Sequence, residues 1–250
     1  MRHSVNLVLL LPEDFISEDQ VKLTGRRAQH LLTIKRVTLG DRLLVGQLNG
    51  QQGQGRVIAI EQHSVLLKVI LDTPPIAPLP VHLILALPRP KMLKRILQTI
   101  SAMGVKQLSL IHCAKVEKSY WQSPWLEQNK IAENLFLGLE QAQDTLLPKV
   151  TCYQRFKPFV EDRLAELSAN TRKIIAHPGQ GEHCALVLAN KRTIGAATPT
   201  ITTTLAIGPE GGFTDYEIAL FEQVGFKTCH LGERILRVEN AIPVLLGQFI

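Results

Sequence analysis

The segment with the clearest potential for chemistry is a glycine-rich loop near residue 210. It reads Ala206-Ile207-Gly208-Pro209-Glu210-Gly211-Gly212-Phe213, and it joins an apolar, β-branched stretch to Thr214-Asp215-Tyr216-Glu217. Thr214 and Glu217 have the spacing of a helix capping box. Glycines let a backbone turn sharply and approach a ligand closely. The pattern indicates a ligand-binding loop, with a tight connecting turn as the alternative. It lacks the spacing of a P-loop or of a dinucleotide-binding fingerprint.

A second segment reads Leu231-Gly232-Glu233-Arg234-Ile235-Leu236-Arg237-Val238-Glu239-Asn240-Ala241. Arg237 and Glu239 are two positions apart, so they do not share a helix face. The spacing suits a loop, or a loop with Glu239 at the start of a helix, where its charge is favourable. The alternative is a surface patch of ion pairs, which contributes little free energy. Spacing alone favours that alternative.

Two further segments carry polar groups. His177-Pro178-Gly179-Gln180-Gly181-Glu182-His183-Cys184 lacks the ligand spacing of a metal site, which favours a glycine-rich loop beside a pocket, and we predict no metal. Arg89-Pro90-Lys91-Met92-Leu93-Lys94-Arg95 holds four cations and no acid, so phosphate contact and a solvated surface fit it equally well. No nucleophilic triad is recognisable, because the G-x-S-x-G pattern is absent.

Composition limits the class of protein. The 250 residues include 28 Lys and Arg against 22 Asp and Glu, a net charge of +6 that favours an anionic partner such as nucleic acid or an anionic membrane surface. The 2 Trp, 3 Tyr and 8 Phe give poor support to a reader built on stacked aromatics. No apolar stretch is long enough to span a membrane.

The four cysteines, Cys113, Cys152, Cys184 and Cys229, are too sparse for a disulfide scaffold. We therefore expect them to be reduced and mostly buried, in a cytoplasmic protein.

The chain divides at a proline-rich stretch. Four prolines between residues 74 and 80 predict a stiff linker, with domains at 1–73 and 81–250. The first domain shows short strands at 42–48, 55–61 and 65–71 and a helix near 28–37, which suggests a small β-barrel-like module. Six cations and one acid in residues 22–42 favour an RNA-contacting surface and a solvated charged face about equally.

After the linker, strands and helices alternate. This order predicts an α/β domain with a largely parallel sheet, whose ligands bind beyond the carboxyl ends of the strands. We expect strands at 81–87, 107–112, 150–153, 173–176, 203–207 and 227–231, and helices at 91–103, 126–142, 158–169, 214–224 and 239–249.

Together, the two C-terminal segments resemble the ribosomal RNA small-subunit uridine N3-methyltransferases (RsmE-type) of the SPOUT superfamily. The resemblance rests on Ile207-Gly208-Pro209-Glu210-Gly211-Gly212-Phe213, followed about twenty residues later by Leu231-Gly232-x-Arg234-Ile235-Leu236-Arg237-x-Glu239-x-Ala241. It extends over the whole chain, from Met1-Arg2 through the basic β module and the linker to the α/β domain. The pairing of the two motifs in this order is specific, whereas either alone is weak.

The resemblance implies a PUA-like RNA-binding barrel followed by a SPOUT domain with a trefoil knot, which acts as a homodimer on ribosomal RNA or the small ribosomal subunit. It implies S-adenosylmethionine (SAM) as the methyl donor. The SAM-binding residues implied are His177, Pro178, Gly179, Ile207, Gly208, Pro209, Glu210, Gly211, Gly212, Leu231, Gly232, Ile235, Leu236 and Arg237.

For transfer of the methyl group to uracil N3, we expect Arg237 to stabilise the negative charge on the uracil oxygens or to orient the base. Glu239 is the candidate to accept the proton or hold Arg237, and Glu210 is a weaker alternative base. The expected RNA contacts are Arg2, Lys22, Arg26, Arg27, Lys35, Arg36, Arg89 and Lys91.

This sequence departs from the family pattern at Val238, Asn240, Gln143 and the stretch from Arg89 to Met92. The glycine loop and Arg237 are intact, so the departures concern RNA contacts and rate more than cofactor binding. A SPOUT methyltransferase with another RNA target and a non-catalytic ribosome-assembly protein are the alternatives. A Rossmann-type nucleotide enzyme is disfavoured by the missing fingerprint.

Overall fold

The computed structural model describes residues 6–179, 181–189 and 203–250. It divides into two compact units, Met1–Ile76 with Phe136–Leu147, and Ala77–Leu135 with Pro148–Ile250. Arg2, an expected RNA contact, lies outside the described residues. Residues 136–147 thus belong to the first unit, although the sequence analysis placed all of 81–250 in the second domain.

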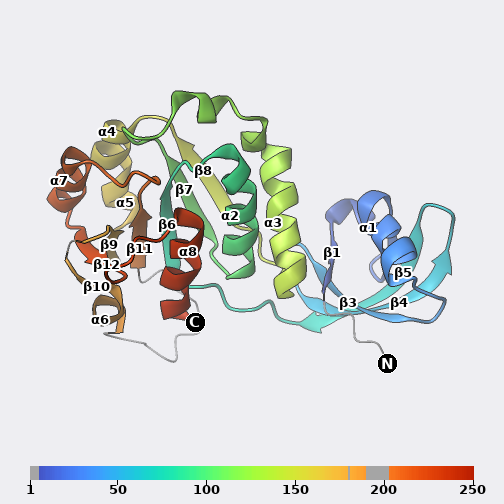
Figure 1. The fold of residues 1–250 in the computed structure, drawn as a ribbon. Coiled ribbons are helices and arrows are strands. Elements are labelled where there is room, and N and C mark those ends of the chain that lie inside the picture. Colours follow the sequence, from blue (N-terminus) through green and yellow to red (C-terminus); the bar gives the residue numbers. More distant parts are fainter. Residues whose placement is uncertain (1–5, 180, 190–202) are drawn as a thin grey trace. The chain divides into compact units, whose positions relative to one another are not determined.

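The first unit is a five-stranded sheet with the order β1-β3-β4-β5-β2 (Figure 1). Strand β1 runs parallel to β3, and the other neighbours are antiparallel. Alternating burial along β4 shows that one face of this sheet is packed and the other is solvated, as antiparallel sheets allow. The strands are β1 (Val8–Leu10), β2 (Gln20–Leu23), β3 (Arg42–Gln47), β4 (Gln52–Ile60) and β5 (Val65–Thr73).

Two apolar clusters hold this unit together. The larger joins the inward side chains of the sheet to Ala28 and Leu31, which lie on α1 (Gly25–Gln29) and the π-helical turn after it (His30–Lys35). The smaller joins Leu7 and Leu9 to Leu139 on the last turns of α3 (Gln128–Ala142). This second cluster explains why residues 136–147 belong to the first unit.

The second unit is a seven-stranded sheet with the order β10-β12-β9-β11-β6-β7-β8, and every neighbouring pair is parallel. The expected α/β class with a parallel sheet is confirmed. All residues of β6 and β11 are buried, as is usual for strands covered on both faces. The strands are β6 (Val81–Ala86), β7 (Gln107–Ile111), β8 (Lys149–Tyr153), β9 (Arg172–Ala176), β10 (Glu182–His183), β11 (Thr203–Ile207) and β12 (Lys227–His230).

The helices of the second unit lie where the alternation predicts them, except for α6, which the sequence analysis did not predict. Helices α2 (Pro90–Ala102) and α8 (Val238–Leu246) contact each other (Figure 1). The remaining helices are α4 (Phe156–Pro158), which continues through a π-helical stretch (Phe159–Leu164) into α5 (Ala165–Leu167), and α6 (Cys184–Ala189) and α7 (Asp215–Gln223). Among the described residues, no helix combines the length and the apolar character needed to cross a membrane.

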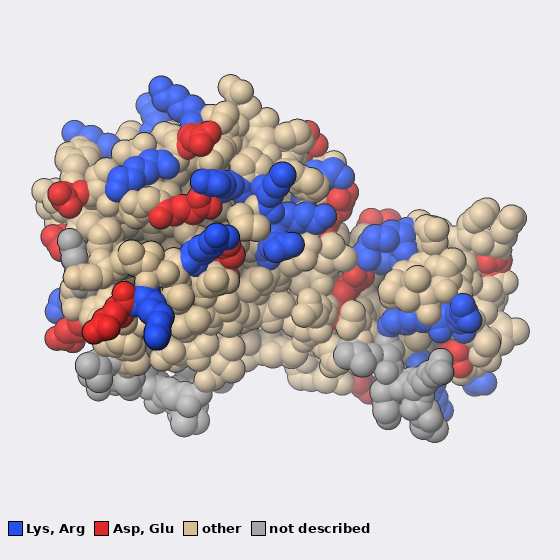
Figure 2. Space-filling model, in the orientation of Figure 1, with Lys and Arg blue, Asp and Glu red and all other residues tan. Residues whose placement is uncertain are grey.

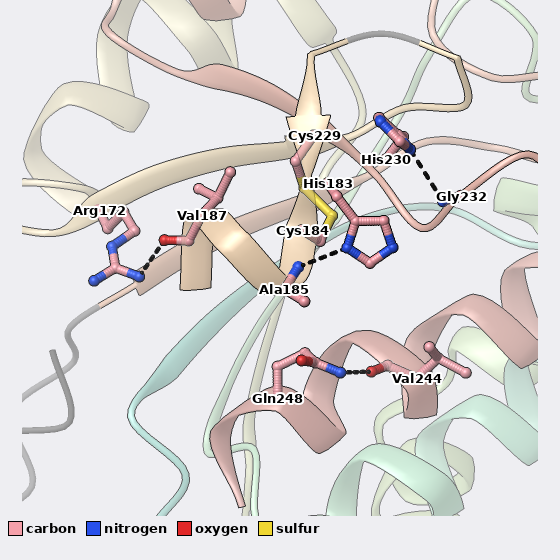
Figure 3. The surroundings of a disulfide bond; sticks show 10 residues. All are labelled: Arg172, His183, Cys184, Ala185, Val187, Cys229, His230, Gly232, Val244 and Gln248. Atoms are coloured by element: carbon pink, nitrogen blue, oxygen red, sulfur yellow. Dashed lines mark hydrogen bonds between the residues drawn. A yellow bond between two sulfur atoms is a disulfide. The ribbon is translucent and has the colours of Figure 1, made fainter. Parts of the chain in front are cut away.

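The expectation of four reduced cysteines is wrong for two of them. Cys184 and Cys229 form a disulfide that joins the first residue of α6 to β12 (Figure 3). Strand β10 pairs with β12, with Glu182 opposite Cys229, and Cys184 directly follows β10, so the register brings the two cysteines close together. Cys113 is free and buried, and Cys152 is free but exposed.

Candidate functional site

A cavity lies beyond the carboxyl ends of β9, β11 and β12. Its volume is about 640 Å³ including open solvent at its mouth. Its walls come from the loop after β9, the glycine loop after β11, the loop after β12 and the first turns of α8. The lining residues are Ala176, His177, Pro178, Ile207, Gly208, Pro209, Glu210, Gly212, Cys229, His230, Leu231, Gly232, Arg234, Ile235, Leu236, Val238, Ala241 and Leu245.

The glycine loop is a tight turn that leads into α7. The Gly212 amide donates a 2.8 Å hydrogen bond to the Pro209 carbonyl. Gly212 has a φ of +71°, which favours glycine, and an added Cβ would lie 3.4 Å from the His177 ring. The expected capping box is confirmed: the Thr214 amide donates to the Glu217 carboxylate at 2.8 Å, and the Glu217 amide donates to the Thr214 hydroxyl at 3.3 Å.

The loop after β7 contacts the glycine loop and α7 through two hydrogen bonds. The ammonium group of Lys115 donates to the Gly211 carbonyl, and the Ala114 amide donates to the carboxylate of Glu217, each over 2.7 Å. Glu217 is only 2 % exposed, and its remaining oxygen also accepts the Thr214 hydroxyl at 3.0 Å. The sequence analysis did not identify Lys115, because no motif connects it to a loop 96 positions away.

His177 brings a polar group to the cavity wall. Its backbone amide donates to the Cys229 carbonyl at 2.9 Å, and its buried Nδ1 has no hydrogen-bond partner among the described residues. Burial lowers the pKa of His177, the nearby charge of Lys115 lowers it further, and Asp215 partly opposes the shift. The lowered pKa favours the neutral imidazole.

The expected catalytic residues lie beside the cavity. Arg237 precedes α8 with an exposed side chain, and its carbonyl accepts hydrogen bonds from the amides of Asn240 and Ala241. Glu239 lies in the first turn of α8 and is partly exposed. Within the described part of the chain, the cavity wall includes Val238 but neither of its neighbours.

Most of the expected cofactor residues come together in this wall, and three do not. Gly179, Gly211 and Arg237 are outside the lining of the described cavity, while the other expected residues belong to it. The sequence analysis missed Ala176, Cys229, His230, Arg234, Val238, Ala241 and Leu245 as lining residues. Ala176, Cys229 and His230 end strands whose following loops were recognised, so their positions at strand ends were the available signal.

No metal centre forms from the histidines and cysteines near this wall. His183 Nδ1 accepts the Ala185 amide at 3.2 Å, and His230 Nδ1 accepts the Gly232 amide at 3.0 Å (Figure 3). Cys184 and Cys229 are bonded to each other. Over residues 6–179, 181–189 and 203–250, no group of three or more His, Cys, Asp or Glu side chains is placed to hold a metal ion.

The expected RNA-contacting cations differ in their surroundings. Arg27 is 15 % exposed in its side chain and makes a two-armed ion pair with buried Asp14, so it stabilises the fold. Lys22 pairs with Glu61 at 2.9 Å and Arg26 pairs with Glu140 at 3.0 Å. Lys35 Nζ donates to the Asn6 carbonyl at 3.3 Å. The side chains of Arg36 and Lys91 are exposed, as is Arg89, whose Nε lies 2.8 Å from a Glu210 oxygen.

Comparison with known proteins places the chain in a family. Residues 75–250 match the model of the RNA methyltransferase domain. Ribosomal RNA small subunit methyltransferase E of Treponema pallidum is 30% identical over 95% of this chain and 87% of its own length. The protein of the same name from Synechocystis is 26% identical over 96% of this chain and 76% of its own length.

Solved structures have the same fold. The ribosomal RNA small subunit methyltransferase E of Neisseria gonorrhoeae bound to S-adenosyl methionine superposes with a TM-score of 0.75 at 20% identity, over 96% of this chain and 95% of that one. A putative methyltransferase of Legionella pneumophila in complex with SAM gives 0.75 at 19% identity, over 99% and 96%. With the family model and the Treponema relative, the chain belongs to the RNA methyltransferase family of the ribosomal RNA small subunit methyltransferase E proteins.

Proposed function

We propose that this protein is a SAM-dependent methyltransferase that methylates N3 of a uridine in small-subunit (16S) ribosomal RNA. The observation that carries the proposal is the convergence of the two C-terminal motifs on one cavity. Glycine-loop residues and residues 231, 232 and 234–236 line the same wall, although they are separated in sequence by α7 and β12. Membership of the family and the SAM-bound neighbour from Neisseria gonorrhoeae support this reading.

The lining of the cavity suits SAM in its chemistry. Its wall combines backbone groups of the glycine loop, apolar side chains such as Ile235 and Leu245, and the imidazole of His177. An added Cβ at Gly208 would lie 3.1 Å from Phe213, so a larger residue there would require Phe213 to move by a few tenths of an ångström. When bound, SAM supplies an electrophilic methyl group on a sulfonium.

The protein has to position the uracil, take its N3 proton and stabilise the charge that then spreads onto O2 and O4. Oriented binding and preorganised donors supply most of the acceleration in such reactions. Arg237, exposed beside the cavity, is the donor toward the uracil oxygens. Glu239, two residues further on, is the proton acceptor or holds Arg237. N3 of a paired uridine is hidden, so the target is unpaired or extruded.

Glu210 is a weaker candidate for the base. Its carboxylate is already paired with the Arg89 guanidinium, at 2.8 Å. We assign Glu210 and Arg89 to shaping the mouth of the cavity. Arg89 and Lys91 then reach RNA phosphates from the start of α2.

The first unit acts as the PUA-like RNA-binding module in this proposal, and its exposed cations Arg26, Arg36 and Lys22 contact phosphates. The mixed sheet and its single packed face are compatible with a small barrel. Arg27 serves the fold through Asp14.

The second unit is a SPOUT domain with a knotted C-terminal segment that pairs as a homodimer in the cytoplasm. Large apolar side chains that flank the last helix are exposed, Ile235 by 80% and Ile250 by 69%, and burial against a partner would remove this surface from water.

The test uses small ribosomal subunits that lack the modification, incubated with the protein and labelled SAM. Incorporation of label, with a new primer-extension stop at one uridine, is the expected result, because N3-methyluridine cannot form Watson–Crick pairs. Label without a stop would indicate another RNA position or a ribose target. Absence of SAM binding by calorimetry would indicate a non-catalytic RNA-binding protein.

A further inference from the structure

The few polar aromatic residues of this chain are unevenly placed. The sequence has 2 Trp and 3 Tyr, and three of these five, Tyr120, Trp121 and Trp125, occur within residues 120–125. They lie on two short 3₁₀ helices, Lys118–Gln122 and Pro124–Leu126, in the segment that follows β7. All three side chains are partly exposed. We refer to Tyr120, Trp121 and Trp125 as the aromatic platform.

Specific contacts hold the two indole rings. Trp121 Nε1 donates to His112 Nδ1 at 2.9 Å, and His112 directly follows β7. The ammonium group of Lys94, on α2, lies 5.3 Å from the centroid of the Trp125 ring. Such a cation over an aromatic face is attracted by the ring quadrupole. The rings are thus oriented before any ligand arrives.

The platform lies close to the cofactor cavity. The same segment provides Lys115, which donates to the Gly211 carbonyl of the glycine loop. The Tyr120 hydroxyl donates to Glu117 at 3.1 Å. Desolvation and that hydrogen bond raise the pKa of Tyr120, the charge of Arg89 lowers it, and the charge of Glu210 raises it. Tyr120 is therefore within electrostatic reach of the Arg89–Glu210 pair at the mouth of the cavity.

Several exposed cations accompany the platform, on its own segment or on α2 and the loop before it. Lys94, Lys115 and Lys118 have exposed side chains, and Arg89 is 64% exposed. Figure 2 shows Lys and Arg side chains gathered on this face of the second unit, over α2 and the loops near it, with a few acidic residues among them. Aromatic rings set among cations match the chemistry of single-stranded nucleic acid, whose bases stack while its phosphates pair with Lys and Arg.

We propose that the aromatic platform is a second RNA-binding site, which stacks an unpaired nucleobase that neighbours the target uridine. This inference rests on the proposed function, because it takes the RNA to be the substrate of the adjacent cavity. The platform holds the strand at the mouth of the cavity, and Lys115 and Lys118 contact its backbone. Stacking is tolerant of base identity, so the platform selects unpaired RNA and discriminates little between base sequences.

The chain provides its own probe for this site. Its two tryptophans, Trp121 and Trp125, both belong to the platform, so intrinsic tryptophan fluorescence reports on the platform alone. The experiment titrates the full-length protein with an oligouridylate of about eight nucleotides, a typical length for single-strand sites. We expect saturable quenching by the oligouridylate and little change with duplex RNA of the same length.

Substitutions separate stacking from structure. We expect Trp125→Ala to weaken oligouridylate binding roughly 10-fold, measured by anisotropy of labelled RNA, and Trp125→Phe to restore most of the affinity. Tyr216→Ala is the matched control, because Tyr216 is 59% exposed on α7 outside the platform, and it should bind RNA like the unmodified protein. Thermal unfolding of each variant checks that the fold is intact.

The outcomes for the platform and for the proposed function can be told apart. The proposed RNA-binding role of the platform is refuted if single-stranded RNA leaves the tryptophan fluorescence unchanged or if duplex RNA quenches it equally. It is also refuted if Trp125→Ala binds RNA with normal affinity. Calorimetry with SAM is run on the same samples. Quenching by RNA without SAM binding would contradict the methyltransferase proposal and still support RNA binding by the platform. SAM binding and methyl transfer, with unaltered RNA affinity in Trp125→Ala, would contradict only the RNA-binding role of the platform.

Discussion

The ammonium group of Lys115 donates a 2.7 Å hydrogen bond to the carbonyl oxygen of Gly211. The aliphatic part of the same side chain lies along the loop, so an added Cβ at residue 211 would be 2.9 Å from Lys115 Cδ. Gly211 is not among the described glycines with positive φ, and a larger residue there would have to displace the flexible Lys115 side chain. Lys115 thereby fixes the glycine loop from outside the cavity.

Removing this contact should weaken cofactor binding. Lys115→Met keeps the apolar stem and loses the hydrogen bond, which is worth about 1 kcal/mol, so we expect SAM affinity to fall on the order of 5-fold. Calorimetry with SAM measures the effect. Lys115→Arg should retain most of the affinity, and Lys118→Met, which changes an exposed neighbour, should retain all of it. Equal SAM affinity in Lys115→Met and the unmodified protein would show that the contact does not position the loop.

Loss of Arg237 should slow methyl transfer far more than it weakens SAM binding. Arg237 lies beside the cavity and not in its wall, so Arg237→Ala should leave SAM affinity within a few-fold of normal. Removing one donor to a developing anion commonly slows the reaction on the order of 100-fold or more. Single-turnover methylation of small ribosomal subunits measures the rate. Arg234→Ala is the control, because Arg234 lines the cavity and should affect SAM affinity first. Normal turnover by Arg237→Ala would remove Arg237 from catalysis.

The lowered pKa of His177 predicts a pH dependence of stability. Burial, and then Lys115, hold the pKa below its ordinary value of 6.5. Above pH 6.5, His177 is neutral in both the folded and the unfolded chain, so it adds nothing to the pH dependence of the free energy of unfolding. As the pH falls below it, the unfolded chain binds a proton that the folded site resists, so the free energy of unfolding decreases.

Urea unfolding at a pH near 7.5 and at one near 5.5 tests this prediction, since the two values bracket the titration of the unfolded histidine. His177→Gln should lose less stability between them than the unmodified protein. Part of the loss should persist, because burial also lowers the pKa of His82. An identical loss in both proteins would contradict the assignment to His177.

The disulfide between Cys184 and Cys229 should stabilise the folded chain. It closes a separation of 45 residues. By chain entropy, closing an unfolded loop of that length raises the free energy of unfolding by about 4 kcal/mol at most. We therefore expect Cys184→Ser to lower the free energy of unfolding by about 2–4 kcal/mol under oxidising conditions. Chemical unfolding with and without reductant measures the difference. Cys152→Ser, at an exposed free thiol, should be nearly neutral. Detection of four free thiols in the denatured, unreduced protein would rule out the bond.

Apolar patterning made the second unit largely predictable. The strands β6 and β11 are mainly apolar, interrupted only by His82 and by Thr203 and Thr204, and both are fully buried in the parallel sheet. The capping box of Thr214 and Glu217 depends on local spacing, and it forms as predicted. The strand β2 was missed because Gln20–Leu23 alternates over only four residues beside a cluster of cations.

Features that depend on distant contacts were not predictable. The hydrogen bond from Lys115 to Gly211 spans 96 positions. The assignment of Phe136–Leu147 to the first unit arises from packing of Leu139 against Leu7 and Leu9, which a helical period alone cannot specify. The pairing of Cys184 with Cys229 follows from the register of β10 against β12, which no spacing of cysteines encodes.

The central claim is that the loops after β9, β11 and β12 form one SAM site. Hydrogen–deuterium exchange with and without SAM tests it most directly. The account predicts that SAM slows exchange together in residues 176–179, 207–212 and 229–238, and leaves the strands of the first unit unchanged. Protection of only one of these loops, or of none of them while SAM binds elsewhere, would contradict the claim.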